Sequence, residues 1–296
     1  MCLFVRVCFI AALALGGDAY VVLAQTGDSA VVVGAFRNAV AFSVDPAGMM
    51  YVIDGATSEV LKLSPEGRML AKMGGYGWEQ GTFDRPADIV SPNGLDIYVA
   101  DYGNHRIERF DRSLNFISSY STRQDQEQQN RFGYPQSVAV SRFGAIFIVD
   151  GENNRIVKLS PDGSVERVFG DIRSGAGKLS SPRRIRVSDD DLVYVLDGNA
   201  IVVFDIFGNY IKQAGSGLPA GVSALAVERK TVCVLDSCKM YTLGKSSSIR
   251  RATELEVLRG RIGLCDVIDI QALGGTMYFL TRHEILRSPI LREDTR

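Results

Sequence analysis

Residues 96–111, DIYVADYGNHRIERFD, decide the fold of this chain, because weaker copies of the same pattern recur before and after them. An apolar strand ends in an Asp, a short polar loop with an Arg follows, and a second strand ends in an aromatic residue and a turn. This order predicts a β-hairpin. A copy that starts at Tyr278 has Thr281 in place of the Asp, whereas the other copies align on Asp54, Asp101, Asp150, Asp197 and Asp236.

Each copy belongs to a repeat of four short apolar segments separated by turn residues. In the first repeat we predict strands over residues 40–44, 50–53, 60–63 and 69–72. The last repeat supplies three strands, and residues 30–36 precede the first repeat without belonging to it. We therefore expect an all-β, six-bladed β-propeller of four-stranded blades, in which the N-terminal strand completes the last blade.

Glycine-rich connections join the repeats, for example residues 74–86 and 169–182. Together with the Asp-x-x-Asn-His-Arg-Ile core that begins at Asp101 and the Ser-Pro-Asp-Gly turn, they resemble the NHL repeat. The resemblance is strong in the first four repeats and faint in the last two. It implies a six-bladed NHL-type propeller, but it implies no single activity, because the family includes protein-binding, RNA-binding and sensor domains and relatives of propeller lyases.

The first residues have the composition of a secretory signal peptide. One positive charge at Arg6 precedes an apolar run over residues 7–15, and Val22-Leu23-Ala24 suits a cleavage site. Cleavage after Ala19 and an apolar first strand are the alternatives. The run is too short to span a bilayer, so we expect no membrane span in the mature protein. The predicted plan is a signal peptide over 1–24, one propeller over 25–290 and a tail over 291–296, in a secreted or periplasmic protein.

Export would leave three cysteines, Cys233, Cys238 and Cys265, and an odd number leaves one unpaired. Cys238 lies in a predicted hairpin loop, and Cys265 lies just before the last repeat's first strand. Both positions are expected at the same end of the fold, so Cys238 and Cys265 are the better disulfide pair. Three buried thiols are the alternative.

Charge and residue counts limit the partners and cofactors. The chain has 33 Lys plus Arg against 34 Asp plus Glu, so its net charge of −1 indicates neither a polyanion nor an anionic membrane as partner. Export also argues against nucleic acid. Two histidines exclude a multi-His zinc site. We predict no cofactor, although calcium stays open, because different repeats can supply its oxygen ligands.

The repeated hairpin motif has a structural explanation. An Asp that ends a strand before a turn most often accepts hydrogen bonds from the loop backbone, and a residue present in each repeat is explained by the repeat. We assign this role to the five aligned acids and to the motif residues that follow two of them, Asn104, His105, Arg106, Asn154 and Arg155.

A second pattern appears when the innermost strands are aligned. One position in them is occupied, from the first repeat to the last, by Ala41, Asp88, Ser137, Arg184, Ala224 and Val267. Asp88, Ser137 and Arg184 are thus predicted to form a polar arc in the central channel that could hold a small polar ligand. The favoured alternative is a structural Asp88 to Arg184 salt bridge that plugs the channel.

Aromatic residues gather in the connections at one predicted face, and Trp78, Tyr102 and Tyr134 are the candidate binding anchors. Packing over the blade edges is the alternative. The leading hypothesis is an exported, monomeric, non-catalytic binding module for protein, peptide or glycan that uses this loop face. The alternative is an enzyme that resembles propeller lyases or lactonases, with a metal or an acid–base pair in the channel.

Overall fold

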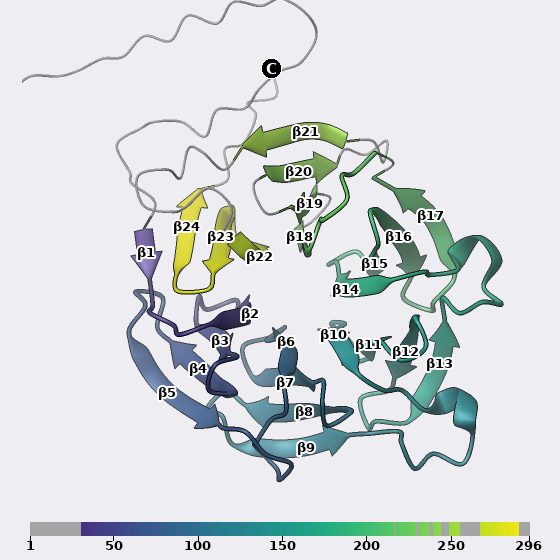
Figure 1. The fold of residues 1–296 in the computed structure, drawn as a ribbon, viewed down its shortest axis with the longest axis horizontal. Coiled ribbons are helices and arrows are strands. Elements are labelled where there is room, and N and C mark those ends of the chain that lie inside the picture. The colour runs from purple at the N-terminus through teal and green to yellow at the C-terminus, as the bar shows by residue number, and fades with distance from the viewer. Residues whose placement is uncertain are drawn as a thin grey trace, which may run out of the picture.

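The computed structural model describes residues 31–215, 217–228, 231–236, 239–243, 249–254 and 267–289. They form six four-stranded antiparallel sheets arranged around one axis (Figure 1). The predicted six-bladed β-propeller is therefore confirmed. The predicted signal peptide, the pair Cys238 and Cys265, and the predicted tail lie outside the described residues.

In blades 1 to 5 the strands follow one another from the axis to the rim in chain order. Blade 1 has β2 (Ala39–Val44), β3 (Met50–Asp54), β4 (Glu59–Leu63) and β5 (Met69–Gly74); blade 2 has β6 (Pro86–Val90), β7 (Asp96–Asp101), β8 (Arg106–Asp111) and β9 (Phe116–Tyr120). Blade 3 has β10 (Pro135–Val140), β11 (Ile146–Asp150), β12 (Arg155–Leu159) and β13 (Val165–Phe169); blade 4 has β14 (Pro182–Val187), β15 (Leu192–Asp197), β16 (Ala200–Asp205) and β17 (Tyr210–Ala214). Blade 5 has β18 (Ala224–Glu228), β19 (Thr231–Leu235), β20 (Lys239–Leu243) and β21 (Ile249–Glu254).

Blade 6 joins the two ends of the described chain. It contains β22 (Val267–Leu273), β23 (Thr276–Thr281), β24 (Ile285–Pro289) and, on its outer edge, β1 (Val31–Val33). Strand β1 pairs antiparallel with β24, with Val31 opposite Arg287 and Val33 opposite Ile285. The prediction that the N-terminal strand completes the last blade is thus confirmed.

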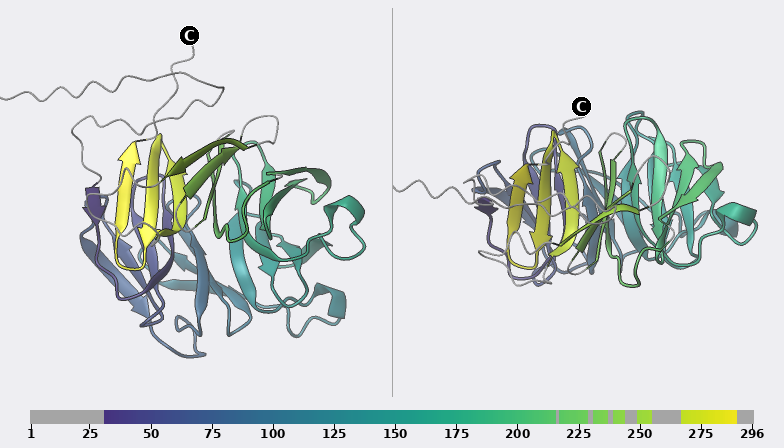
Figure 2. Two further views of the ribbon diagram at one scale, coloured as in Figure 1. Left: turned by 45° about the horizontal axis from the view of Figure 1, so that its top comes forward. Right: turned by 90° about the horizontal axis from the view of Figure 1, so that it is seen from above.

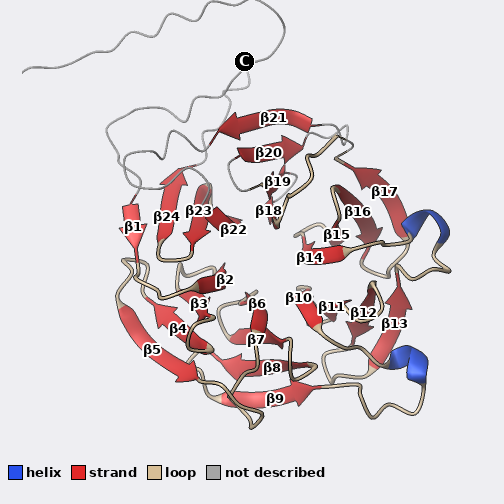
Figure 3. Ribbon diagram, viewed as in Figure 1, coloured by secondary structure: helices blue, strands red, loops and turns tan. Residues whose placement is uncertain are grey.

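The core lies between neighbouring blades, whose apolar faces pack against each other. Between blades 3 and 4, for example, the buried rings of Phe169 and Phe204 meet at 4.9 Å between centroids. Figure 2 shows the resulting disc, with the strands running across its thickness. Figure 3 shows two short 3₁₀ helices at its rim, η1 (Gln128–Asn130) and η2 (Gly175–Gly177). The part of the chain that the structure describes contains no helix long and apolar enough to cross a membrane.

One face of the disc carries the connections between blades and the loops between the second and third strands. The two kinds of segment touch, since Gly103 N–H in the hairpin loop of blade 2 donates to the Asp84 carbonyl in the preceding connection. We call this surface the loop face. Each inner strand starts there and ends at the opposite face, so the turn after β10 lies on the opposite face.

Candidate functional site

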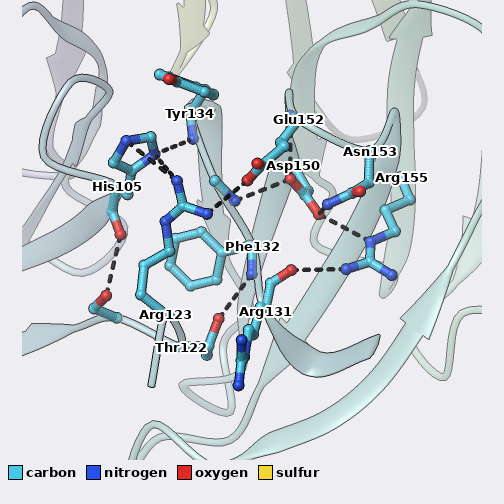
Figure 4. Close-up of polar contacts among 12 residues, drawn as sticks. His105, Thr122, Arg123, Arg131, Phe132, Tyr134, Asp150, Glu152, Asn153 and Arg155 are labelled. Atoms are coloured by element: carbon cyan, nitrogen blue, oxygen red, sulfur yellow. Dashed lines mark hydrogen bonds and ion pairs between the residues drawn. The ribbon is translucent and has the colours of Figure 1, made fainter. Parts of the chain in front are cut away.

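The repeated Asp residues fasten the hairpin loops to the connections that precede each blade. Asp101 accepts hydrogen bonds from Asp84 N–H at 2.9 Å, Asn104 Nδ2 at 2.7 Å and Arg106 Nε at 2.8 Å. Asp150 is held in the same way in blade 3, by a backbone N–H, an Asn and Arg155 (Figure 4). The backbone N–H groups of Arg37, Ser180 and Lys239 donate to Asp54, Asp197 and Asp236 at 2.7, 2.9 and 2.6 Å.

The residue before the motif Arg has a left-handed backbone in both blades. The φ angle is +54° at His105 in blade 2 and +51° at Asn154 in blade 3. Asn and His are both among the residue types that are enriched in this conformation. The amide that contacts Asp150 belongs to Asn153, so the predicted motif residue Asn154 has another place in the loop.

Polar side chains on the inner strands link the blades at the axis. Asp88 Oδ2 accepts the hydroxyl of Ser137 on the next blade and, at 3.2 Å, the N–H of Val138. Ser137 Oγ in turn accepts the N–H of Ile185 on blade 4 at 3.1 Å. The reason is physical: an inner strand has no further strand beside it, so its outward N–H groups need other acceptors. The preceding blade supplies them.

The charged members of this axial group differ from the prediction in two respects. Asp88 pairs with Arg186, whose Nη1 lies 3.1 Å from Asp88 Oδ2, while Arg184 donates to the Ala87 carbonyl at 3.3 Å. The expected Asp88 to Arg184 salt bridge is therefore wrong. The sixth position of the ring belongs to Asp269, which faces Leu280 as Asp88 faces Ala100.

Val267 was placed in the ring wrongly because the last repeat was aligned two residues out of register. The register of β22 shifts between Val267 and Asp269, and Val267 pairs with Thr281 as Pro86 pairs with Asp101. Since Thr281 replaces the repeated Asp, the last repeat gives no clear marker for this alignment. Four ring positions are consequently polar, rather than three.

The balance between burial and the two arginines shifts the pKa values of the two axial carboxylates in opposite directions. Burial opposes ionisation of Asp88, but Arg186 and Arg184 outweigh it and lower its pKa. For Asp269, burial outweighs the arginines and raises the pKa. Asp269 Oδ2 and Arg184 Nε are buried and have no hydrogen-bond partner among the described residues. Within the same residues, no group of three or more His, Cys, Asp or Glu side chains is placed to hold a metal ion.

The loop face carries a stack of planar side chains where blades 2 and 3 meet, which we call the aromatic–arginine ladder: Arg85, Tyr102, Tyr134, His105 and Arg123. The Arg85 guanidinium lies 5.2 Å from the centre of the Tyr102 ring. The ring centroids are 5.1 Å apart for Tyr102 and Tyr134, and 4.2 Å apart for Tyr134 and His105. Arg123 Nη2 lies 3.2 Å from His105 Nδ1 and completes the stack (Figure 4).

Three ladder residues have backbone strain. The φ angles of Arg85, His105 and Tyr134 are +52°, +54° and +48°, and a left-handed backbone costs a residue other than glycine about 1 kcal/mol or more. Arg85 and Tyr134 also precede the prolines that begin β6 and β10, and a residue before proline favours an extended backbone. Such strain persists only where the surroundings impose it, and it gathers at functional sites.

Two further aromatic side chains lie exposed on the connection before blade 2. Tyr76 and Trp78 are 66% and 68% exposed, and their rings meet edge to face at 5.5 Å. The backbone of their loop is held by the motif residues of blade 2, because Asn104 Nδ2 donates to the Gly77 carbonyl at 2.9 Å and Arg106 Nη1 donates to the Trp78 carbonyl at 3.0 Å. Phe83 on the same connection is fully buried and belongs to the core instead.

A family model described as NHL repeat matches residues 83–110, which include the motif of blade 2 and the last three residues of the connection before it. This stretch of the chain is an NHL repeat. The match covers three of the five ladder residues, Arg85, Tyr102 and His105.

Three characterised relatives of this NHL-repeat chain differ in what their names describe. It is 28% identical to "Protein brain tumor" of Drosophila melanogaster over 49% of this chain and 14% of that protein. It is 27% identical to "Probable peptidyl-alpha-hydroxyglycine alpha-amidating lyase pgal-1" of Caenorhabditis elegans (48% and 40%) and 25% identical to human "NHL repeat-containing protein 3" (63% and 57%). The chain thus spans less than two thirds of the length of each relative.

Solved structures of similar fold include virginiamycin B lyase from Staphylococcus aureus, with a TM-score of 0.60, 17% identity and coverage of 84% of this chain and 80% of that one. A streptogramin B lyase structure matches with a TM-score of 0.58 and 12% identity, over 86% and 93%. At these identities the likeness shows the shared propeller fold alone.

The structure thus separates the predicted site residues of this NHL-repeat protein into two groups. Asp88, Ser137 and Arg184 meet at the axis, whereas Trp78, Tyr102 and Tyr134 lie on the loop face. The prediction missed several residues of both groups. It also missed the buried Glu108 on β8, which belongs to neither group and which a closer alignment of the repeats would have found, because the matching residues in blades 1 and 3 are Leu61 and Val157. The others missed are Arg186 and Asp269 at the axis, and Arg85 and Arg123 in the ladder.

Proposed function

We propose that this NHL-repeat protein is an exported, non-catalytic binding module, secreted or periplasmic, that holds a protein partner on its loop face across blades 2 and 3. The ladder, together with Tyr76 and Trp78, is the observation that supports it. Trp, Tyr and Arg are the residue types that dominate the binding energy of protein interfaces. All three types are exposed on the loop face, with Trp78 beside Tyr76 and Arg85 against Tyr102.

Preorganisation of these side chains favours the same function. Trp78 sits on a loop whose carbonyls are tied to Asn104 and Arg106, and Tyr134 is fixed by its own N–H and by stacking on both sides. Ordering a free side chain on binding costs about 0.5–1.5 kcal/mol, and side chains that are already ordered avoid this cost. A rigid aromatic surface can therefore bind with few contacts.

The test starts from a partner identified by crosslinking in the native compartment and then purified. Calorimetry should show that Trp78→Ala weakens binding by about 30-fold, the loss typical of a central interface residue. Phe143→Ala is the matched control, because Phe143 is 67% exposed in the turn after β10 on the opposite face. Equal binding by wild type, Trp78→Ala and Tyr134→Ala would exclude the loop face as the binding surface.

The axial group supports a second candidate, a lyase that acts on a peptide ending in α-hydroxyglycine. The supporting observations are the similarity to pgal-1 and two buried atoms, Asp269 Oδ2 and Arg184 Nε, that have no hydrogen-bond partner among the described residues. Release of the peptide amide from such a substrate, and its loss in Asp269→Asn, would support this candidate. Absence of turnover by the wild-type protein, with and without added divalent metal, would remove it.

A further inference from the structure

We infer that the ladder is acid-sensitive: protonation of His105 releases Tyr134 and so opens the loop-face surface. The structural part of this inference concerns the free protein. Its consequence, that a bound partner leaves in acid, rests on the proposed function.

The hydrogen bonds around His105 define its proton state. Tyr134 N–H donates to His105 Nδ1 at 3.0 Å, and Arg123 Nη2 approaches the same nitrogen at 3.2 Å (Figure 4). The backbone N–H of Tyr134 can only donate, so Nδ1 carries no proton and the neutral ring holds its proton on Nε2. Arg123 Nη2 also lies 3.4 Å from Nε2, so it does not decide the tautomer. A proton added to Nδ1 would face two donors, one of them a guanidinium cation.

Charged groups reach His105 from every segment that packs on it. Arg123 comes from the connection after β9, Glu152 from the hairpin loop of blade 3, and Arg85 and Asp84 from the connection before β6. Burial and Arg123 are the largest influences on the pKa of His105, and both lower it, as Arg85 also does. Glu152 and Asp84 raise it, but the net effect is a pKa below the ordinary value of 6.5. Glu152 is also engaged by Arg123 at 2.9 Å, which limits its support for an imidazolium.

Loss of this hydrogen bond should move Tyr134, because its backbone has a favoured alternative. At φ +48° before Pro135 the residue is strained, and an extended backbone relieves both the left-handed conformation and the contact with the proline. Moving Tyr134 would also separate its ring from Tyr102 and His105. The matching position in blade 3 has Asn154, whose amide does not titrate, so the acid response belongs to the junction of blades 2 and 3.

The decisive experiment is an NMR pH titration of the whole protein. The chain has two histidines, so a His283→Asn variant leaves His105 as the only imidazole signal. We expect the Nε2-protonated tautomer at pH 7.5, a midpoint below 6.5, and a change of the Tyr134 amide signal with the same midpoint. In His105→Asn, which suits the left-handed backbone, the Tyr134 signal should stay constant between pH 7.5 and 5. Glu108→Gln should leave the response unchanged.

A Tyr134 amide signal that stays constant while His105 titrates would overturn the inference. With a purified partner, wild-type affinity should fall at least tenfold between pH 7.5 and pH 5.5, while His105→Asn binds equally at both. Binding at pH 7.5 without loss at pH 5.5 would refute the acid response alone. Absence of binding at pH 7.5 would refute the proposed function alone, because the NMR response does not depend on it.

Discussion

Replacing Glu108 by Gln should stabilise the protein at neutral and alkaline pH. Glu108 lies on β8 and is fully buried. Its carboxylate accepts Gly81 N–H at 3.2 Å and lies 3.3 Å from Arg106 Nη2. Burial raises its pKa from 4.5 to about 7, because these two partners compensate only part of the lost hydration.

The size and sign of the effect follow from the difference between folded and unfolded protein. A pKa raised from 4.5 to about 7 means that the folded state binds the proton more tightly than the unfolded state does. The free energy of unfolding should therefore fall as pH rises from about 4.5 to about 7, then stay level. At about 1.4 kcal/mol for each tenfold change in the ionisation constant, the total is about 3 kcal/mol.

Urea unfolding of both proteins at several pH values between 4.5 and 8.5 measures this contribution. Gln has the shape of the neutral acid, so wild type and Glu108→Gln should have similar free energies of unfolding near pH 4.5. At pH 8 Glu108→Gln should be more stable than wild type by about 3 kcal/mol. Other titrating groups cancel in the difference between the two proteins. Glu59→Gln is the matched control of opposite sign, because Lys72 lowers the pKa of Glu59. A difference between Glu108→Gln and wild type that does not vary with pH would refute the reasoning.

Three further predictions concern the axis, the ring closure and the loop face. Arg186→Met should lower the free energy of unfolding by about 3–5 kcal/mol, measured by urea unfolding, because Asp88 would lose its buried partner. Val33→Asp should lower the melting temperature clearly, measured by calorimetry, because Val33 is buried where β1 closes blade 6, whereas the exposed Val31→Asp should change it little. Trp78→Ala should change the unfolding free energy by no more than about 0.5 kcal/mol, so that any loss of binding reports the surface alone.

The sequence was sufficient to predict the fold because each repeat unit is bounded by recognisable turn residues. Alternating apolar segments, turn residues and one Asp per hairpin locate four strands in each copy, and the surplus strand at residues 30–36 has one place where it can pair. The prediction failed where the repeat loses its markers. Without an Asp in place of Thr281, the last repeat was aligned two residues out of register, and Asp269 was missed.

The site residues were harder to predict because their partners lie on different blades. Asp88 and Arg186 are 98 residues apart in the chain, so only the closed ring brings them together. In the same way, the ladder combines residues from two connections and one hairpin loop. The aromatic residue types at Trp78, Tyr102 and Tyr134 indicated a binding surface. The left-handed backbone at Arg85 and Tyr134 could not be predicted, because glycine is the residue type that usually indicates this conformation and neither position has one.

The strain in the ladder distinguishes the two groups of residues as functional candidates. At the axis, Asp88 and Ser137 satisfy backbone N–H groups of the neighbouring strands, so the closed ring itself explains why they are polar. Arg85 and Tyr134 satisfy no comparable need: a glycine at either position would adopt the same backbone without strain. Because the closed ring does not require large side chains in these conformations, their presence is better explained by what they present to a partner, and the loop face is the stronger candidate.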